Sequence, residues 1–439
     1  MATILKRLRV LDLSRVLAGP YCAQLLADQG ADVIKVENPG TGDENRVWGM
    51  RASDGITSNF HSVNRGKRGI TLNLKSEAAR DVLRKLIAKS DVVIQSFLPE
   101  SAARLGVDYD GVRAIKPDVI YCSINGYGPK GALHNKAGYD LMMQAFSGMM
   151  STTGYADGPP VRSGASVIDM STGITAYGGI MTALVKRMQG GGGSHVTVSL
   201  LETAISLLGY HAVAWLQTGK LPTKEGSGVW HLVPYQAFQC KDGYMLVGAT
   251  NDAAWQRFCD AIDRKDLDAD PRFHTNDKRL EHRAILVKLL QDIFITENAA
   301  HWITRFDAKG VAASPINTLD QALAHPQVAA NHMVVPVTDA QGREFPTVGM
   351  PFKLSGDASY ATSAAPPLGA HTEEVLRGTL GWSDEQIEAA RAAGAFDARH
   401  RRPGGFRFCS AHAPGGSRRA RAARRPQRVR ALGRTGLSA

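Results

Sequence analysis

The sequence predicts an α/β fold with two parts: a large Rossmann-like domain built on a mostly parallel sheet, and a smaller α+β domain. In the first half, short runs rich in Val and Ile alternate with stretches of helical length. This alternation is typical of a parallel sheet covered by helices on both faces. The texture changes near residue 225, where a hairpin pattern begins. At 439 residues the chain is long enough for two domains.

The elements of the first half follow in a regular order. We expect strands at 9–13, 31–36, 69–74, 91–97 and 118–124, with helices at 20–29 and 76–89. A longer helix is expected from about 170 to 189, before a glycine run and a strand at 195–199. Since the carboxyl ends of parallel strands share one edge of the sheet, a ligand site is expected at that edge.

The second half predicts the smaller domain and a return to the first. Strands at 233–240 and 244–248 flank an Asp-Gly turn, and helices are expected at 253–262, 276–295 and 298–309. A last helix, Ser383–Ala393, carries a capping box of Ser383 and Gln386. The predicted divisions are 1–225 and 326–400 for the large domain, 226–325 for the small domain, and a tail at 401–439.

The net charge of the chain comes from this tail. The chain has 52 basic and 41 acidic residues, and eleven of the basic ones are arginines in 401–439, which contains no Asp, Glu or Lys. The first 400 residues are therefore balanced, 41 against 41, and nucleic-acid binding is not indicated. We expect the tail to be disordered. It is either a basic anchor for anionic partners or the product of a frameshift in a GC-rich gene.

The absence of membrane-span, signal and cysteine motifs predicts where the protein is located and that its thiols are reduced. No apolar run approaches the roughly 18–20 residues that span a bilayer, so no membrane contact is expected. Residues 1–10 are basic but lack an apolar signal core, and they are read as mature structure rather than as a short presequence. The five cysteines show no metal or CxxC spacing, which favours reduced thiols in the cytoplasm. Cys22 and Cys122 are interpreted as buried structural thiols rather than nucleophiles.

Asp169 is the main candidate for chemistry. It follows the apolar segment 165–168 and precedes the long helix, so helix amides would favour its ionised form as a nucleophile or base. The alternative is that Asp169 only caps the helix. The turn 14–20 lacks a GxGxxG pattern, and the chain has no GxSxG, HExxH or P-loop motif. The cations of 64–68 suit a phosphate or carboxylate, or a charged surface loop.

Many segments in the same order resemble the class III CoA-transferases, the family of formyl-CoA transferase and carnitine CoA-transferase. The resemblance runs from about residue 5 to 395. It is carried by Arg9–Cys22, Gly30–Glu37, Gly42–Arg46, Asn64–Arg68, Leu72–Lys75, Arg104–Gly106, Gly126–Pro129, Tyr139–Asp140, Thr153–Gly154 and Gly158–Pro160.

The resemblance implies a role for Asp169. In that family an aspartate at this position attacks an acyl-CoA thioester to give a mixed anhydride and CoA thiolate. The thiolate returns to form an aspartyl-CoA thioester, which the acceptor carboxylate attacks. Coenzyme A is then a substrate, with no permanent cofactor and no metal. The family also implies an interlocked homodimer.

The resemblance further implies which residues contact CoA. Val16, Leu17 and Ala18 would line the nucleotide, and Leu72 and Lys75 would flank the adenine and phosphates. Ser96, Phe97, Leu98 and Arg104 would follow, with Tyr139 and Asp140 near the pantetheine. Asn38 and Ser96 depart from relatives that carry Arg and Asn. The loop over the intermediate would correspond to Gly226–Gly228.

The substrate class follows from finer similarities. α-Methylacyl-CoA racemases, in the same superfamily, need a His where this chain has Tyr139, which favours transfer. Pro234–Phe238, Lys241–Gly243, Pro315–Asn317, His325–Val328 and Pro346–Gly349 look most like succinyl-CoA-dependent dicarboxylate transferases such as succinyl-CoA:glutarate CoA-transferase. Arg46, Arg65, Lys67 and Arg68 would then be available for a distal carboxylate. A racemase and a non-catalytic CoA-binding protein are the alternatives.

Overall fold

A computed structural model describes residues 4–355 and 360–396, so the predicted tail at 401–439 lies outside the described residues. Within the described residues, six parallel strands form one sheet in the order β3-β2-β1-β4-β5-β6. The strands are β1 (Arg9–Leu13), β2 (Asp32–Glu37), β3 (Lys67–Thr71), β4 (Val92–Gln95), β5 (Ile120–Asn125) and β6 (Ser194–Ser199). The predicted mixed α/β fold with a parallel sheet is confirmed, in the strand order of a doubly wound fold.

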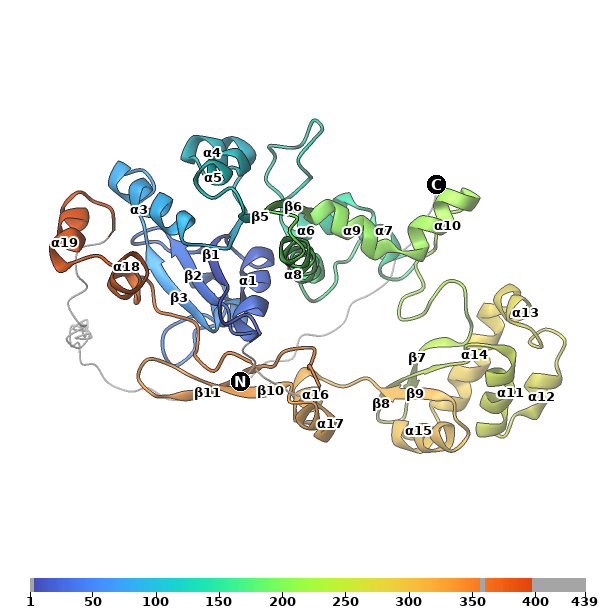
Figure 1. Ribbon diagram of the computed structural model, residues 1–439. Helices are drawn as coiled ribbons and strands as arrows, with labels where there is room; N and C mark the ends of the chain where they lie inside the picture. The colour runs from blue at the N-terminus through green and yellow to red at the C-terminus, as the bar shows by residue number, and fades with distance from the viewer. Residues whose placement is uncertain (1–3, 356–359, 397–439) are drawn as a thin grey trace, which may run out of the picture. The chain divides into compact units, whose positions relative to one another are not determined.

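Helices cover both faces of this sheet (Figure 1). The segments that connect the strands contain α1 (Ala18–Asp28), η1 (Glu44–Arg46), α2 (Ser58–Asn64), α3 (Glu77–Ala88), α4 (Pro99–Leu105), α5 (Tyr109–Ile115), α6 (Asp140–Phe146), α7 (Met149–Thr152) and α8 (Val167–Met188). They are followed by α9 (Leu200–Leu208) and α10 (Tyr210–Thr218). From the other end of the chain, α18 (Thr372–Leu380) and α19 (Asp384–Ala392) pack on the α3 face, and α19 begins with the predicted capping box.

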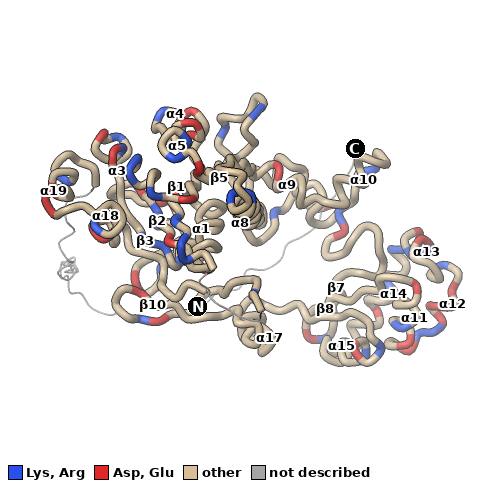
Figure 2. Tube along the Cα trace, viewed as in Figure 1, with Lys and Arg blue, Asp and Glu red and all other residues tan. Residues whose placement is uncertain are grey.

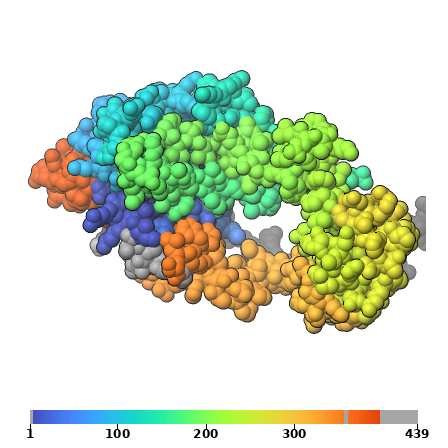
Figure 3. All heavy atoms as spheres, turned by 45° about the vertical axis from the view of Figure 1, so that its right-hand side comes forward, coloured from blue at the N-terminus to red at the C-terminus, as the bar shows by residue number. Residues whose placement is uncertain are grey.

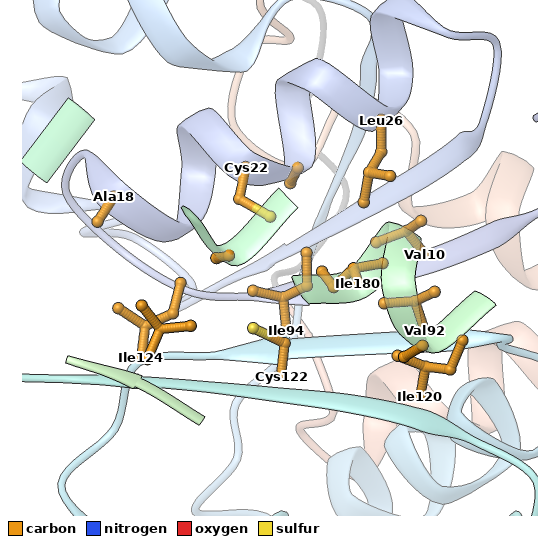
Figure 4. Packing of buried hydrophobic residues seen from close by; sticks show 14 of the residues in the cluster. Val10, Ala18, Cys22, Leu26, Val92, Ile94, Ile120, Cys122, Ile124 and Ile180 are labelled. Carbon is orange, nitrogen blue, oxygen red and sulfur yellow. The ribbon is translucent and has the colours of Figure 1, made fainter. Parts of the chain in front are cut away.

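Two apolar layers hold the helices to the sheet. Alternate residues of a strand point to opposite faces, so Val10 packs in the layer under α1 and α8 while Leu11 packs in the layer under α3 and α18. Cys22 and Cys122 lie in the first layer with Ile94 and Ile180, as Figure 4 shows. Both thiols are buried, and burial raises the pKa of Cys122 to about 12. The prediction that both thiols are buried is confirmed, and their structural role stays a prediction.

The long helix α8 begins three residues earlier than predicted. Its N-cap is Ser166 and its first residue is Val167, so the apolar segment 165–168 is not a strand and Asp169 is not the N-cap. The helix packs closely along α1 because residue 173 is glycine. A Cβ there would lie 2.7 Å from the carbonyl oxygen of Ala18. This close contact brings Asp169, one turn earlier, to the start of α1.

The second half contains a separate three-stranded antiparallel sheet, ordered β7 (Tyr235–Cys240), β8 (Gly243–Gly248) and β9 (Ala312–Pro315). The hairpin was predicted, but β9 was not. The helices of this region are α11 (Asp252–Ala261), α12 (Lys265–Ala269), α13 (Asn276–Glu281), α14 (Arg283–Phe294) and α15 (Ala299–Ala308). The predicted helix 276–295 is thus two helices, separated at His282. An apolar core between Val233 and Val311 supports the predicted small domain.

The remaining elements connect this region to α18. They are α16 (Leu319–Ala324), α17 (Pro326–Ala330), β10 (Val334–Thr338) and β11 (Glu344–Val348), the last two forming an antiparallel pair. Acidic and basic residues both occur along α11, α12 and α13 (Figure 2). Across the described ranges, no helix combines the length and apolar character that a membrane crossing needs.

Candidate active site

Two cavities meet where the strand order of the sheet reverses, between β1 and β4. The turns that follow these strands are joined by a hydrogen bond of 3.0 Å from the Arg15 amide to the Ser96 hydroxyl. The smaller cavity, about 180 Å³, is named here the Asp169 cavity; the larger has a volume of about 850 Å³. Arg15, Glu44 and Phe97 line both. The expected ligand position at the carboxyl ends of the strands is therefore hollow.

The cavities divide the predicted site residues into two groups. The Asp169 cavity is lined by the turn and helix residues Val16, Leu17, Ala18, Ser96, Leu98, Tyr139 and Asp169. The larger cavity is lined by Asn38, Leu72, Lys75 and Arg104. The turn residues that were expected beside a nucleotide thus line the same cavity as Asp169. Phe97 stands at the junction of the two cavities.

Asp169 has an unusual environment for a carboxylate. Its side chain is 8 % exposed, and within 4–355 and 360–396 no side chain or amide donates a hydrogen bond to it and no cation pairs with it. Burial, and next the charge of Asp140, raise the pKa of the Asp169 carboxyl from 3.8 to about 7. The sequence interpretation, that helix amides favour the ionised form, is therefore wrong for this side chain.

Asp140 explains why those amides do not stabilise Asp169. One oxygen of Asp140 accepts hydrogen bonds from the backbone amides of Ile168 and Asp169, at 2.8 and 3.0 Å. The other accepts from the Gln144 side chain at 2.5 Å. The negative charge that compensates the N-terminus of α8 thus comes from the start of α6. Asp140, predicted near pantetheine, is buried and does not line either cavity.

The larger cavity carries two cations without a carboxylate partner. Lys75 and Arg104 line it, and no ion pair joins either to another part of the described chain. The nearest polar contact of the Arg104 guanidinium is the Ser101 hydroxyl at 3.2 Å. Two free cations beside the apolar side chains of Leu72 and Leu105 suit an anionic ligand with an aromatic base.

The cations predicted for a distal carboxylate are held by the protein's own acids. Arg46 pairs with Glu37 at 2.6 Å, and Arg65 pairs with Asp28 at 2.6 Å. Lys67 is fully buried, 2.9 Å from Asp12, and Arg68 pairs with Asp32 at 2.7 Å. None of the four lines the Asp169 cavity. In the structure these side chains hold the sheet edge and α1 through ion pairs with the protein's own acids.

The predicted loop over the intermediate, Gly226–Gly228, lies beside the segment that contains Gly154 and Tyr155. The Gly226 amide donates to the Gly154 carbonyl at 2.9 Å, and a Cβ at Gly226 would meet the Tyr155 ring at 2.4 Å. Gly228 packs near Gln236. Neither glycine lines the Asp169 cavity or the larger cavity.

Sequence reasoning missed Arg15 and Glu44, which form an ion pair of 2.7 Å between the two cavities. Arg15 lies two residues after the end of β1 and sits over the Phe97 ring, 5.9 Å from its centroid. Its position after a strand that ends at the predicted ligand edge was a usable signal. Glu44 gave none, because its contact with Arg15 depends on the path of a loop.

A family model described as CoA-transferase family III matches residues 5–372. The chain belongs to this family. The resemblance derived from the ordered motifs is thereby confirmed, and the protein is a family III CoA-transferase, an enzyme whose substrates are CoA thioesters.

Relatives match this CoA-transferase over most of its length. An acyl-CoA transferase of Fusarium pseudograminearum is 40% identical over 391 residues, covering 87% of this chain and 85% of that protein. Succinyl-CoA:glutarate CoA-transferase of Homo sapiens is 36% identical over 400 residues, 90% of each. A crystal structure of a CAIB/BAIF family protein from Brucella suis matches with a TM-score of 0.77 and 35% identity, covering 87% of this chain and all of that one.

Proposed function

We propose that this CoA-transferase moves CoA between short carboxylic acids through covalent intermediates on Asp169. The Asp169 carboxylate attacks the thioester carbonyl of the donor, forming an acyl–aspartyl anhydride and releasing CoA thiolate. The thiolate attacks the aspartyl carbonyl, which gives an aspartyl-CoA thioester and frees the donor acid. The acceptor carboxylate attacks this thioester, which forms a second anhydride with Asp169 and releases the CoA thiolate. The thiolate then attacks the acyl carbonyl of the acceptor, which gives the new acyl-CoA and regenerates Asp169.

The observation that carries this proposal is the lack of partners at Asp169. The other buried aspartates of the described chain, residues 12, 28, 43 and 140, all accept hydrogen bonds from cations, amides or both. A buried carboxylate without such partners is unfavourable for the fold. It is instead suited to react, since a carboxyl group with perturbed pKa in a cavity is a characteristic of catalytic sites.

The N-terminus of α1 faces the same cavity and complements the chemistry. Ala18 and Gly19 line it, α1 has no acidic residue in its first turn, and its N-cap Leu17 supplies no side-chain bond. Because the first amides of a helix lack partners within the helix, they can donate to negative charge on an oxygen or sulfur in the cavity. We infer that they stabilise the oxyanion formed when Asp169 attacks the thioester.

The free cations orient the CoA moiety. We infer that Lys75 and Arg104 hold its phosphates in the larger cavity, so that the pantetheine thioester passes Phe97 into the Asp169 cavity. Removing either cation, as in Lys75→Ala or Arg104→Ala, is expected to raise KM for acyl-CoA about tenfold with little change in kcat, because it removes binding shared by ground and transition states. Steady-state kinetics at varied acyl-CoA concentration measures the effect.

Two controls make the result specific. Arg257→Ala removes an exposed cation of α11 that forms no ion pair with the described residues, and it should leave KM unchanged. Acyl-pantetheine, which lacks the nucleotide, should be used equally by the wild type and both variants. An equal loss with acyl-CoA and acyl-pantetheine would contradict the assigned orientation.

The substrates are proposed to be dicarboxylic, with succinyl-CoA as a donor, as the name of the human relative suggests for that protein. In place of the four predicted cations, Arg15 is the cation that borders the Asp169 cavity. The Arg15 side chain is half-exposed, so a substrate carboxylate can replace Glu44 as its partner.

A comparison of acceptors tests the proposed substrate class. Wild-type enzyme should prefer glutarate to a monocarboxylate of the same chain length, and Arg15→Gln should raise KM for glutarate about tenfold while leaving the monocarboxylate unchanged. Glu44→Gln, which frees Arg15, should act in the opposite direction. Equal turnover of mono- and dicarboxylic acceptors by the wild type would refute the dicarboxylate proposal.

A homodimer, proposed from the family resemblance, is supported by the surface of α8 to α10, part of which Figure 3 shows uncovered in green. Helix α10 has no buried residue, and its large apolar side chains Trp215 and Leu216 are 48% and 79% exposed. Apolar helices of this kind are normally covered by a partner. Sedimentation that detected only monomers would contradict the dimer. The cytoplasmic location stays a prediction.

A further inference from the structure

The turn that enters α1 contains a strained residue. Val16 has a φ of +68°, in the left-handed region. A β-branched residue rarely adopts this conformation, because its side chain crowds the following carbonyl. Such strain persists only where surrounding contacts hold it, and it is concentrated at functional sites. Val16 lines the Asp169 cavity, immediately before Leu17 and Ala18.

The contacts that hold Val16 come from the loop around Asp43. The Val16 amide donates to both carboxylate oxygens of Asp43, at 3.2 and 3.3 Å. The side-chain amide of Asn45 donates to the Val16 carbonyl, so both polar backbone groups of Val16 are bound by this loop. Asp43 also accepts from the Asn45 amide at 3.0 Å, which fixes the start of η1.

A buried cation anchors Asp43 in turn. The Lys35 ammonium lies 2.9 Å from Asp43 and 3.0 Å from the Ser14 carbonyl, and neither charged side chain has any exposed surface. Lys35 belongs to β2, directly beside β1. The carboxylate is thus fixed to the sheet on one side and to the turn on the other.

We propose that Asp43 is a positioning residue for acyl transfer: by holding Val16 in the left-handed conformation, it places the first amides of α1 opposite Asp169. This rests on the proposed function at Asp169 and extends it. Asp43 borders the larger cavity but is only 1% exposed, so it acts through Val16 rather than by contact with substrate. Asp43, within the Gly42–Arg46 segment, thereby gains a role that the sequence alone did not indicate.

The first test is Asp43→Asn, which keeps the size of the side chain and removes its charge. Expected is a 10- to 100-fold loss of kcat/KM for acyl-CoA, since small displacements of catalytic groups have effects of about this size. Asp28→Asn is the matched control, because it breaks an equally buried ion pair, with Arg65, away from the turn. It should lower thermal stability but leave kcat/KM unchanged. Assays are run at a temperature where circular dichroism finds each variant folded.

The decisive test is the coupling between residues 43 and 16. Glycine adopts positive φ without strain, so in a Val16→Gly background Asp43→Asn should reduce kcat/KM by less than about threefold. The same loss in both backgrounds would overturn the proposal, because a merely structural role for Asp43 does not depend on Val16. If Asp43→Asn does not fold, Asn45→Ala replaces it. That variant removes the bond to the Val16 carbonyl, leaves the Lys35 pair intact, and should show the same rescue.

Failure of this proposal is distinguishable from failure of the proposed function. If Asp169→Asn retains transfer, the proposed function and the positioning role toward Asp169 are both lost. If Asp169→Asn is inactive while the single variant Asp43→Asn, with Val16 unchanged, is as active as the wild type, only the role of Asp43 is lost.

Discussion

Replacing Asp169 by alanine or asparagine is expected to lower kcat/KM for CoA transfer by about 10⁴-fold or more, because no other group can form the anhydride and thioester intermediates. The reaction is followed by chromatographic separation of the two acyl-CoA species. No cation or amide of the described residues donates a hydrogen bond to Asp169, so its removal leaves no unpaired partner among them. The loss should therefore be chemical rather than structural.

Binding provides the control for this experiment. Calorimetric titration should give the Asp169→Asn variant a Kd for CoA close to that of the wild type, because Lys75 and Arg104 are unchanged. A variant that binds CoA normally and still transfers it at more than about a hundredth of the wild-type rate would exclude Asp169 as the nucleophile.

The same substitution is expected to stabilise the protein at neutral and alkaline pH. Burial and the charge of Asp140 raise the pKa of Asp169 from 3.8 to about 7, so the fold favours the protonated form. Ionisation of Asp169 destabilises the native state progressively as pH rises from 3.8 to about 7, and the full effect is present above that range. Asparagine resembles the neutral acid. Asp169→Asn should gain about 4 kcal/mol at a pH of about 8 and less than about 1 kcal/mol at a pH of about 4.

Thermal unfolding at the two pH values measures this difference. Asp157→Asn, at an exposed position, is the matched control and should show no pH-dependent gain. Equal melting temperatures of the wild type and Asp169→Asn at alkaline pH would mean that the carboxylate is not destabilising. The activity should change over the same pH range. We expect kcat/KM to rise with pH and to level off above about 7, because Asp169 ionises.

The sheet and its helices could be predicted from local patterns. The strand at 9–13 has the bounds expected, since an apolar run between polar residues specifies a buried strand directly. The start of α8 was placed three residues late, because its N-terminal charge comes from Asp140, 28 residues earlier. Nothing in the segment 165–169 reveals that partner. The strand β9 was missed because its four residues pair with β8 only after the chain has passed through the helices α11 to α15.

The site was predictable in its position and less so in its electrostatics. Asp169, Val16 and Lys75 were found from ordered motifs, and the structure places all three at cavities. The cations of 64–68 were read as available because sequence does not reveal which charges meet. Asp28 and Asp32, more than thirty residues away, pair with Arg65 and Arg68 only through the folding of α1 and β2 against β3.

The most direct test of the central claim is to isolate the covalent intermediate. The enzyme is incubated with acyl-CoA without acceptor, quenched in acid and digested, and the peptides are analysed by mass spectrometry. We expect the peptide that contains Asp169 to carry CoA less one water, and the adduct to disappear with hydroxylamine or with an acceptor acid. Turnover without any adduct at Asp169, or an adduct at another residue, would contradict nucleophilic catalysis by Asp169.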